Sequence, residues 1–416
     1  MGTRDRLLYA GHKTTIMVQR RHEKVTDGGE PNSRKRLIRL FVLVPVGIGL
    51  LSLVPTVSAH GAAESSALSQ SHGLAIAGIG AIGVGALVFL KRSKRISPRT
   101  ALYGIAVGIG VAIAGAIIFE GLAPDPTYQA GSMPFPRSWY QPLAIGTGLL
   151  VVVASFITGL VRWTTRPRYM ALGMLLGGWI LYPYLLPGFS GYTNPIGYGI
   201  VLATPLLVGY ILWNDVGTAL STILRDPVAR RFGFSVGAMV SLFFMATTGY
   251  LSFFSEEGAP QETTVAVLNV LYQIVRWPTL EVLLPDVPFF IAISPGVVIV
   301  LGLLGVLVGL NAAAVAHSWR LDQQAGATQS TAGTATVVGA CTCGCCGPLV
   351  SQVAVIAAGP TIAAPIYWIF VDSASPLSSI FLLGSIALFT GTLVYSIDSP
   401  TPVRQDASEL SAGVTE

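Results

Sequence analysis

Charged residues are scarce in this chain: Asp, Glu, Lys and Arg make up 11% of its 416 residues, whereas a soluble domain carries roughly 25%. Hydrophobic residues account for 52%. Disordered chains combine low hydrophobicity with high charge, so the composition excludes that class. The net charge of +5 suggests a nucleic-acid partner, but most Lys and Arg flank apolar segments. We therefore predict no nucleic-acid partner and a chain surrounded by a lipid bilayer.

Motifs of common catalytic chemistry are also missing. The sequence has no glycine-rich nucleotide-binding loop, no CxxCH haem attachment and no Ser/His/Asp arrangement, so we expect neither ATP hydrolysis nor haem. Few ionisable residues lie in or near the apolar segments, and Glu120, His72, Asp215 and His317 all fall at segment ends. No carboxylate or Lys lies clearly in the middle of a segment. Buried charges mark proton paths in membranes, so a carboxylate-based proton pump is disfavoured. An enzyme is less expected than a transport or transfer protein.

Long apolar segments dominate the rest of the chain. About nine of them have the roughly 20 residues that cross a bilayer. They lie near residues 73–90, 100–120, 142–162, 169–187, 195–213, 233–254, 288–316, 335–358 and 377–397. We predict an all-α, polytopic membrane bundle over residues 60–398, followed by a cytoplasmic tail at 399–416. A further apolar run at 262–276 predicts a helix packed on the bundle, with an interfacial helix or a lid as alternatives.

The first 59 residues divide into two parts. Residues 1–39 are polar and basic and predict a cytoplasmic tail. Residues 40–59 combine a basic flank, an apolar core and a small-residue ending at Ala59, which is the layout of a secretory signal peptide. A first membrane span that is not removed is the alternative. Cleavage after Ala59 would make His60 the first residue of the mature chain.

The distribution of basic residues predicts the orientation. All but two of the 25 Lys and Arg residues, Arg137 and Arg276, fall in segments that the predicted spans place on one side. Because cytoplasmic loops carry the excess of Lys and Arg, that side is predicted to be the cytoplasm. We therefore expect a multi-pass protein of the cell membrane with a cytoplasmic C-terminus and with His60 on the outer side.

All four cysteines of the chain lie within six residues, as Cys341, Cys343, Cys345 and Cys346. Disulfides between residues so close would enclose almost no loop and stabilise little, whereas thiolates are good ligands for copper, zinc or mercury. On a straight helix Cys341 and Cys345 share one face, and Cys343 and Cys346 the opposite one. A break at Gly344 or at Gly347-Pro348 would bring the four sulfurs together. We expect the cysteines to bind a soft metal ion.

Two other interpretations of the cysteines stay open. Cys343 and Cys346 have the spacing of a CxxC dithiol, which indicates a membrane thiol oxidoreductase. Cysteine is also a small apolar residue that packs well in membrane helices, so a non-catalytic accessory subunit is a further alternative.

The segment 344–350, Gly-Cys-Cys-Gly-Pro-Leu-Val, resembles the vicinal-cysteine helix of mercuric-ion transport proteins. In that family a Cys-Cys pair precedes a Gly-Pro-Leu step and passes Hg(II) inward. The resemblance implies that Cys345 and Cys346 are the pair that passes the metal. It covers about ten of the 416 residues, and it lacks the residue that the family usually has between the pair and Gly-Pro.

Three histidines are candidate metal ligands outside the cysteine cluster. His317 lies at the predicted cytoplasmic end of the 288–316 segment, on the same side as the cysteines, where it could serve as an accessory ligand or an entry group. On the outer side, a processed His60 would offer its amino and imidazole nitrogens to copper. Together with His72, this start resembles copper-binding subunits of membrane monooxygenases, which implies an outer copper site and, as an alternative function, a membrane copper oxidoreductase.

The function expected from these patterns is transport or transfer of a soft metal ion. The ion would step between cysteine sulfurs near the cytoplasmic face and leave toward a cytoplasmic thiol acceptor. The sequence predicts no nucleotide cofactor, and it does not determine the oligomeric state.

Overall fold

The computed structural model describes residues 69–122, 136–186, 189–253, 262–284, 289–325, 354, 364–366, 368–369 and 376–398. All of them belong to one compact unit, residues 50–416. The predicted tails at 1–39 and 399–416 and the predicted signal peptide or first span at 40–59 lie outside the described residues. So does nearly all of the predicted span at 335–358.

Helices make up most of this unit, and their starts follow from the sequence. They are α2 (Gln70–Arg92), α3 (Pro98–Gly121), the 3₁₀ turn η2 (Arg137–Trp139), α4 (Tyr140–Arg162), α5 (Pro167–Leu185), α6 (Phe189–Tyr192), α7 (Pro195–Arg225), α8 (Pro227–Thr247), α9 (Pro295–Ala325) and α13 (Pro376–Asp398). Many begin with proline, whose fixed φ and missing N–H suit the first helical position. The preceding residue often caps the helix: the side chains of Ser97 and Asn194 accept backbone N–H bonds at 3.2 and 3.0 Å.

Seven of the described helices are long and apolar enough to cross a membrane: α2, α3, α4 with η2, α7, α8, α9 and α13. This confirms the prediction of a multi-pass helical bundle in its main feature. The predicted span at 169–187 does form a helix, α5, but α5 falls outside that set of seven.

A four-stranded antiparallel sheet is the main departure from the all-α prediction. Its strands are β1 (Leu251–Ser252), β2 (Thr264–Tyr272), β3 (Val275–Leu284) and β4 (Phe289–Ile293), in the order β1-β4-β3-β2. The helix predicted for 262–276 is therefore wrong, because these residues form β2 and the start of β3. Val265, Val267 and Val270 are β-branched and favour extended backbone. Strands β2 and β3 are joined by a two-residue turn, with Tyr272 paired to Val275.

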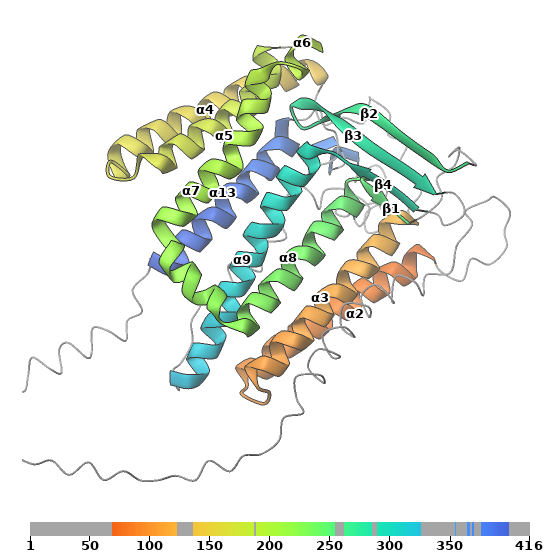
Figure 1. Ribbon diagram of the computed structural model, residues 1–416, viewed down its shortest axis with the longest axis vertical. Helices are drawn as coiled ribbons and strands as arrows, with labels where there is room; N and C mark the ends of the chain where they lie inside the picture. The colour runs from red at the N-terminus through yellow and green to blue at the C-terminus, as the bar shows by residue number, and fades with distance from the viewer. Residues whose placement is uncertain are drawn as a thin grey trace, which may run out of the picture. The chain divides into compact units, whose positions relative to one another are not determined.

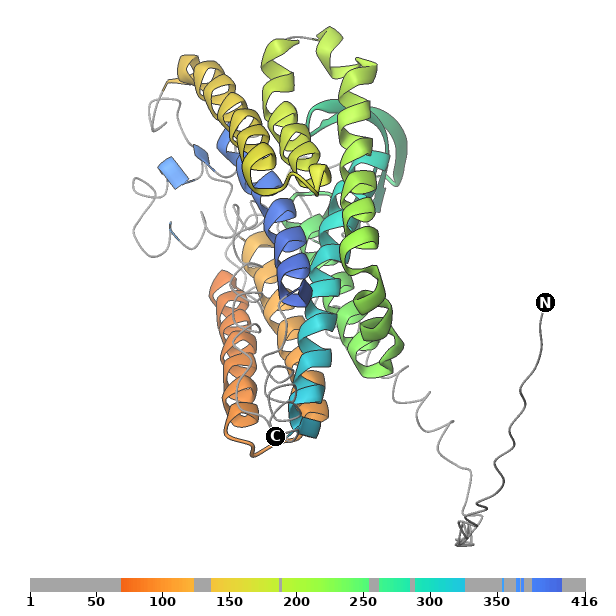
Figure 2. The same cartoon turned by 90° about the vertical axis from the view of Figure 1, so that its left-hand side faces the viewer.

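Within this unit α9 lies among the other helices, and the sheet lies at one end of them (Figure 1). Leu304 and Leu307 of α9 are fully buried. A second view shows the α2–α3 loop and the α7–α8 junction at the end away from the sheet (Figure 2). We call the end formed by β1–β4 the sheet end, and the end formed by residues 93–97 and the α7–α8 junction the junction end. At the junction end the Lys91 ammonium lies 4.3 Å from the centre of the Trp319 ring, which links α2 to α9.

The sheet packs on the bundle through the face that carries Val275 and Trp277, both buried. The Trp277 ring meets the Tyr198 ring edge-on, with 4.9 Å between their centres. A Cβ atom at Gly296, in the first turn of α9, would lie 2.3 Å from the indole nitrogen of Trp277. Glycine at position 296 therefore allows the sheet to rest directly on the start of α9.

Candidate functional site

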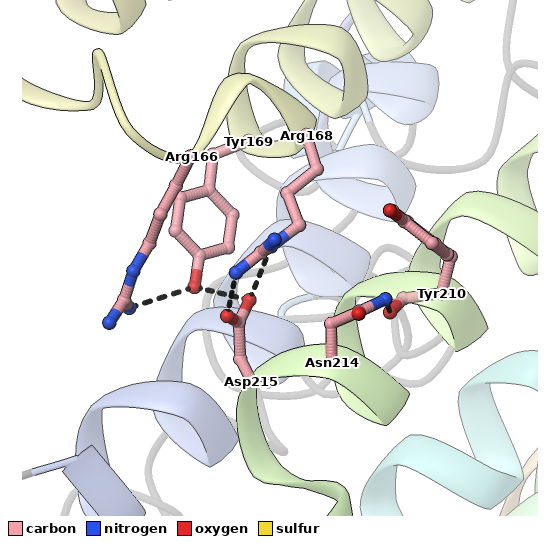
Figure 3. A network of polar contacts seen from close by, with 6 residues as sticks. All are labelled: Arg166, Arg168, Tyr169, Tyr210, Asn214 and Asp215. Carbon is pink, nitrogen blue, oxygen red and sulfur yellow. Dashed lines mark hydrogen bonds and ion pairs between the residues drawn. The ribbon is translucent and has the colours of Figure 1, made fainter.

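One polar cluster inside the bundle joins α5 to α7 and is centred on Asp215 (Figure 3). The Arg168 guanidinium donates to both carboxylate oxygens, from Nε to Oδ2 at 2.8 Å and from Nη2 to Oδ1. The Tyr169 hydroxyl donates to Oδ2 at 2.7 Å. Arg166 in turn donates from Nη1 to the Tyr169 oxygen at 3.4 Å. We call Arg166, Arg168, Tyr169 and Asp215 the Asp215 cluster.

The Asp215 cluster is a closed arrangement. The Asp215 side chain is 4% exposed, and each of its oxygens already accepts a hydrogen bond from α5. A two-pronged Arg–carboxylate contact is among the strongest polar contacts available to a protein. The neighbouring Asn214 points away and donates to the Tyr210 carbonyl of its own helix at 2.9 Å (Figure 3). This geometry fits a cross-link between two helices better than a site that binds a further ligand.

A second polar cluster lies at the junction end and is centred on Asp226, the residue between α7 and α8. Its Oδ1 accepts the Val228 N–H at 3.0 Å and so caps α8. The Arg320 guanidinium of α9 donates to the same oxygen. The other oxygen, Oδ2, lies 3.5 Å from Nδ1 of His317, also on α9. We call Asp226, His317 and Arg320 the Asp226 cluster.

His317 is the incompletely bonded member of the Asp226 cluster. The 3.5 Å separation from Asp226 suits an ion pair when the imidazole is protonated, but it exceeds a normal hydrogen bond. Nδ1 is buried and has no hydrogen-bond partner. The side chain is nevertheless 21% exposed, so side-chain atoms other than Nδ1 are exposed. His317 lines an open cavity of about 280 Å³ together with Asp226, Pro227, Arg320 and Leu321.

The surroundings of Asp226 stabilise the ionised form of its carboxyl group. Burial alone raises the pKa of this carboxyl group, but the Val228 N–H and the positive charge of Arg320 outweigh burial. They hold the pKa of Asp226 below its ordinary value. An ionised carboxylate therefore faces Nδ1 of His317 near neutral pH. A carboxylate in that position is the usual orienting partner of a metal-binding histidine.

Of the predicted site residues, the structure describes His72 and His317. His72 is used in the cap of α2: its Nδ1 accepts the Ser69 N–H at 3.1 Å and lies 2.7 Å from the Ser69 hydroxyl. It lies at the sheet end, because the adjacent Gly73 packs on Phe119 near the end of α3. His317 lies at the junction end, so the structure does not bring the two together. The remaining predicted ligands lie outside the described residues: His60, Cys341, Cys343, Cys345 and Cys346.

Across the described part of the chain, no group of three or more His, Cys, Asp or Glu side chains could hold a metal ion. Asp226 and Arg320 were not among the residues predicted for the site. An Asp directly before Pro227 is a recognisable helix cap, but its pairing with α9 depends on a contact between residues far apart in the sequence.

Comparisons of the chain with protein-family models, with curated proteins and with solved structures gave no match. The function proposed below therefore follows from the residues of this chain.

Proposed function

We propose that this protein binds a soft metal ion and transfers it across or out of the membrane at the junction end of the bundle. The observation that carries the proposal is the sequence itself: all four cysteines lie within six positions, 341–346. Thiolates bind Cu(I), Zn(II) and Hg(II) strongly. The metal is the cargo here, and the ligands are Cys341, Cys343, Cys345 and Cys346.

The Asp226 cluster supports this assignment from the described part of the chain. Helix α9 carries His317, and 23 residues separate positions 317 and 341 in the sequence. A chain of that length can reach over tens of ångströms. A carboxylate beside Nδ1 favours the tautomer with the proton on Nδ1, which leaves the Nε2 lone pair for a metal ion. His317 then serves as an entry group that passes the ion to the thiolates.

The transfer chemistry we propose is ligand exchange. The first step exchanges the metal–nitrogen bond to His317 for a metal–sulfur bond, and each later step forms one metal–sulfur bond and breaks another, so the oxidation state of the metal does not change. A thiol releases its proton when it becomes a ligand, and the leaving thiolate takes up a proton. The final acceptor is a soluble thiol that competes for the ion. By its predicted orientation, the junction end faces the cytoplasm, where thiols are kept reduced.

The deciding experiment measures metal content in the full-length protein purified anaerobically in detergent. Wild type is compared with the variant in which all four cysteines are changed to serine, and with the pairwise variants Cys341→Ser/Cys343→Ser and Cys345→Ser/Cys346→Ser. We expect near-stoichiometric soft metal in wild type after exposure to Cu(I) or Hg(II), and loss of metal in the quadruple variant. The resemblance to mercuric-ion transport proteins predicts the larger loss for the Cys345/Cys346 pair.

Metal bound equally by wild type and by the quadruple serine variant would contradict the proposal. The same result with lower thermal stability would instead favour the accessory-subunit interpretation, in which the cysteines only pack.

A thiol oxidoreductase is the second candidate function, because Cys343 and Cys346 have the spacing of a CxxC dithiol. It predicts that these two thiols react with an alkylating agent after reduction and are protected after mild oxidation. Alkylation that is equally fast in both states would exclude the dithiol mechanism. It would leave metal transfer, which requires no change in thiol oxidation.

A further inference from the structure

A narrow apolar groove runs along the surface where α8 packs against α9. Its volume is about 360 Å³. Small residues of both helices line it, and an arginine stands at one end. Its lining includes Arg230, Ala238 and Ser241 of α8, and Gly302, Gly305 and Val306 of α9.

The groove exists because both helices lack side chains along their contact. A Cβ atom on Gly233 would lie 2.4 Å from the Gly309 carbonyl oxygen, and one on Gly237 would lie 2.6 Å from the Gly305 carbonyl oxygen. The two backbones therefore touch, as in other close pairs of membrane helices, and this contact closes the floor. Gly302 extends the groove outward, since a Cβ atom there would meet nothing within 4 Å.

The two ends of the groove differ in charge. Arg230, in the first turn of α8, is exposed at the junction end. Unlike Arg168 and Arg320, it has no ion-pair partner among the described residues. The far end, near Gly302 and Ser241, is apolar, because the Ser241 hydroxyl already donates to the Gly237 carbonyl at 3.0 Å. The groove thus has a positive mouth and an apolar interior.

The dimensions of the groove select a thin occupant. From Ala313 to Gly302, α9 lines the groove over a rise of about 16 Å at 1.5 Å per residue. A volume of about 360 Å³ over that length makes the groove narrower than an α-helix with its side chains, whose diameter is about 10–12 Å. The lining residues Phe234 and Val306 are 79% and 57% exposed, so the outer walls of the groove are apolar as well.

We propose that this groove binds one hydrocarbon chain of an anionic membrane lipid, whose phosphate group pairs with Arg230. A charged headgroup with an apolar tail matches a positive mouth with an apolar interior. A soluble polar ligand would have Arg230 as its main partner and would leave most of the lining unused. A further helix is too wide to enter the groove. The proposal is independent of the metal chemistry of the cysteines.

Binding of the hydrocarbon chain is tested by filling the groove with a side chain. The Gly302→Leu variant places a side chain in the open part of the groove without striking backbone. The matched control is Gly391→Leu on α13, where a Cβ atom also meets nothing within 4 Å. Each full-length protein is placed in bilayers of equal parts phosphatidylglycerol and phosphatidylcholine, extracted in mild detergent, and analysed by native mass spectrometry. We expect wild type and Gly391→Leu to retain phosphatidylglycerol, and Gly302→Leu to lose it.

Recognition of the lipid headgroup is tested by removing the positive charge of Arg230. Arg230→Gln should lower the preference for phosphatidylglycerol over phosphatidylcholine by about tenfold, the contribution of one charge-assisted hydrogen bond. The control is Arg231→Gln, which removes the same charge from the adjacent exposed position outside the groove. It should leave the preference unchanged.

Three results would overturn the proposal. Equal lipid retention by Gly302→Leu and Gly391→Leu would show that the groove holds no chain. Equal effects of Arg230→Gln and Arg231→Gln would show that Arg230 selects no headgroup. A wild-type dimer that Gly302→Leu converts to a monomer, with lipid retention unchanged, would identify a second copy of the chain as the occupant. If Gly302→Leu fails to insert, Ala238→Leu fills the groove from α8 and gives the same comparison.

Discussion

The Asp215 and Asp226 clusters are each built around an aspartate–arginine pair, but the two pairs have different surroundings. In each, a mostly buried aspartate of one helical segment binds an arginine of another helix. They differ in the third member. Tyr169 completes the Asp215 cluster with a 2.7 Å hydrogen bond. His317 approaches Asp226 to 3.5 Å, and its buried Nδ1 has no hydrogen-bond partner. The first cluster is closed, and the second retains bonding capacity beside a cavity.

This difference separates structural from functional polar groups in an apolar bundle. A buried charge is costly, and the cost is best offset when every bonding position is used. The Asp215 cluster meets that condition and so cross-links α5 to α7. The Asp226 cluster combines a helix cap and an ion pair with one histidine that is not fully bonded. An unsatisfied buried polar group calls for an explanation, and a functional role or a bound ion is one of them; together with the adjoining cavity, this makes the Asp226 cluster the better candidate.

The largest expected effect comes from breaking the closed cluster. Asp215→Asn leaves the Arg168 charge without its partner, and we expect the unfolding free energy to fall by about 3 kcal/mol. Thermal unfolding followed by circular dichroism in detergent measures this. The neighbouring Asn214→Ala is the control and should cost under about 0.5 kcal/mol, because Asn214 is exposed and bonds its own helix.

A double variant sharpens the same test. Asp215→Leu combined with Arg168→Met removes both charges together, and replacing a buried ion pair by apolar residues is often neutral. We expect it to be more stable than Asp215→Asn alone. A double variant as unstable as the single one would mean that shape, and not the paired charge, dominates this site.

Separating the cap from the ion pair at Asp226 should give the next largest effect. Asp226→Ala removes both, and we expect a loss of about 2–3 kcal/mol. Asp226→Asn keeps a good capping side chain and removes the charge, so we expect a loss of about 1–2 kcal/mol. Equal losses for the two variants would show that the bond to the Val228 N–H contributes nothing. Unfolding midpoints at neutral pH provide the measurement.

Acidic pH should weaken the Asp226 cluster through the same carboxylate. The pKa of Asp226 is held below its ordinary value in the folded protein. The folded state therefore favours the ionised form, and this contribution is present above the ordinary pKa of about 4. It is lost as pH falls through the lower folded value. We expect wild type to lose more stability than Asp226→Asn between pH 5 and acid pH. Parallel stability curves for the two proteins would contradict this expectation.

The fold was predictable from sequence wherever the residues of a single segment determine that it forms a helix. Apolar segments of bilayer length gave the helices, and Asn194 and Asp226 before prolines mark two of their starts. The sheet was not predicted, because β2 is apolar on both faces and lacks the alternation that identifies a strand. Its turn, Gln273-Ile274, also lacks the Asn-Gly or Asp-Gly pair typical of a two-residue hairpin. Gln273 adopts a positive φ of 60° there.

The candidate site was predictable only in part, for a different physical reason. His317 stood out as an ionisable residue at the end of an apolar segment. Its partner Asp226 lies 91 positions earlier in the chain, and their proximity results from the packing of α8 on α9. The pairing of Arg168 with Asp215 depends in the same way on the packing of α5 on α7. Contacts of this kind follow from tertiary structure, and the composition or spacing of one segment does not contain them.

The smallest effects on stability are expected at the third members of the two clusters, Tyr169 and His317. Tyr169→Phe removes a 2.7 Å hydrogen bond to Asp215, and we expect a loss of about 1 kcal/mol. His317→Gln removes a ring whose buried nitrogen makes no hydrogen bond, so stability should change by less than about 0.5 kcal/mol. The readout that separates them is metal capture: His317→Gln should slow the loading of Cu(I) or Hg(II) onto the purified protein, and Tyr169→Phe should not. If His317→Gln loads metal at the wild-type rate and is destabilised as much as Tyr169→Phe, then His317 is a structural residue and the two clusters serve the same purpose.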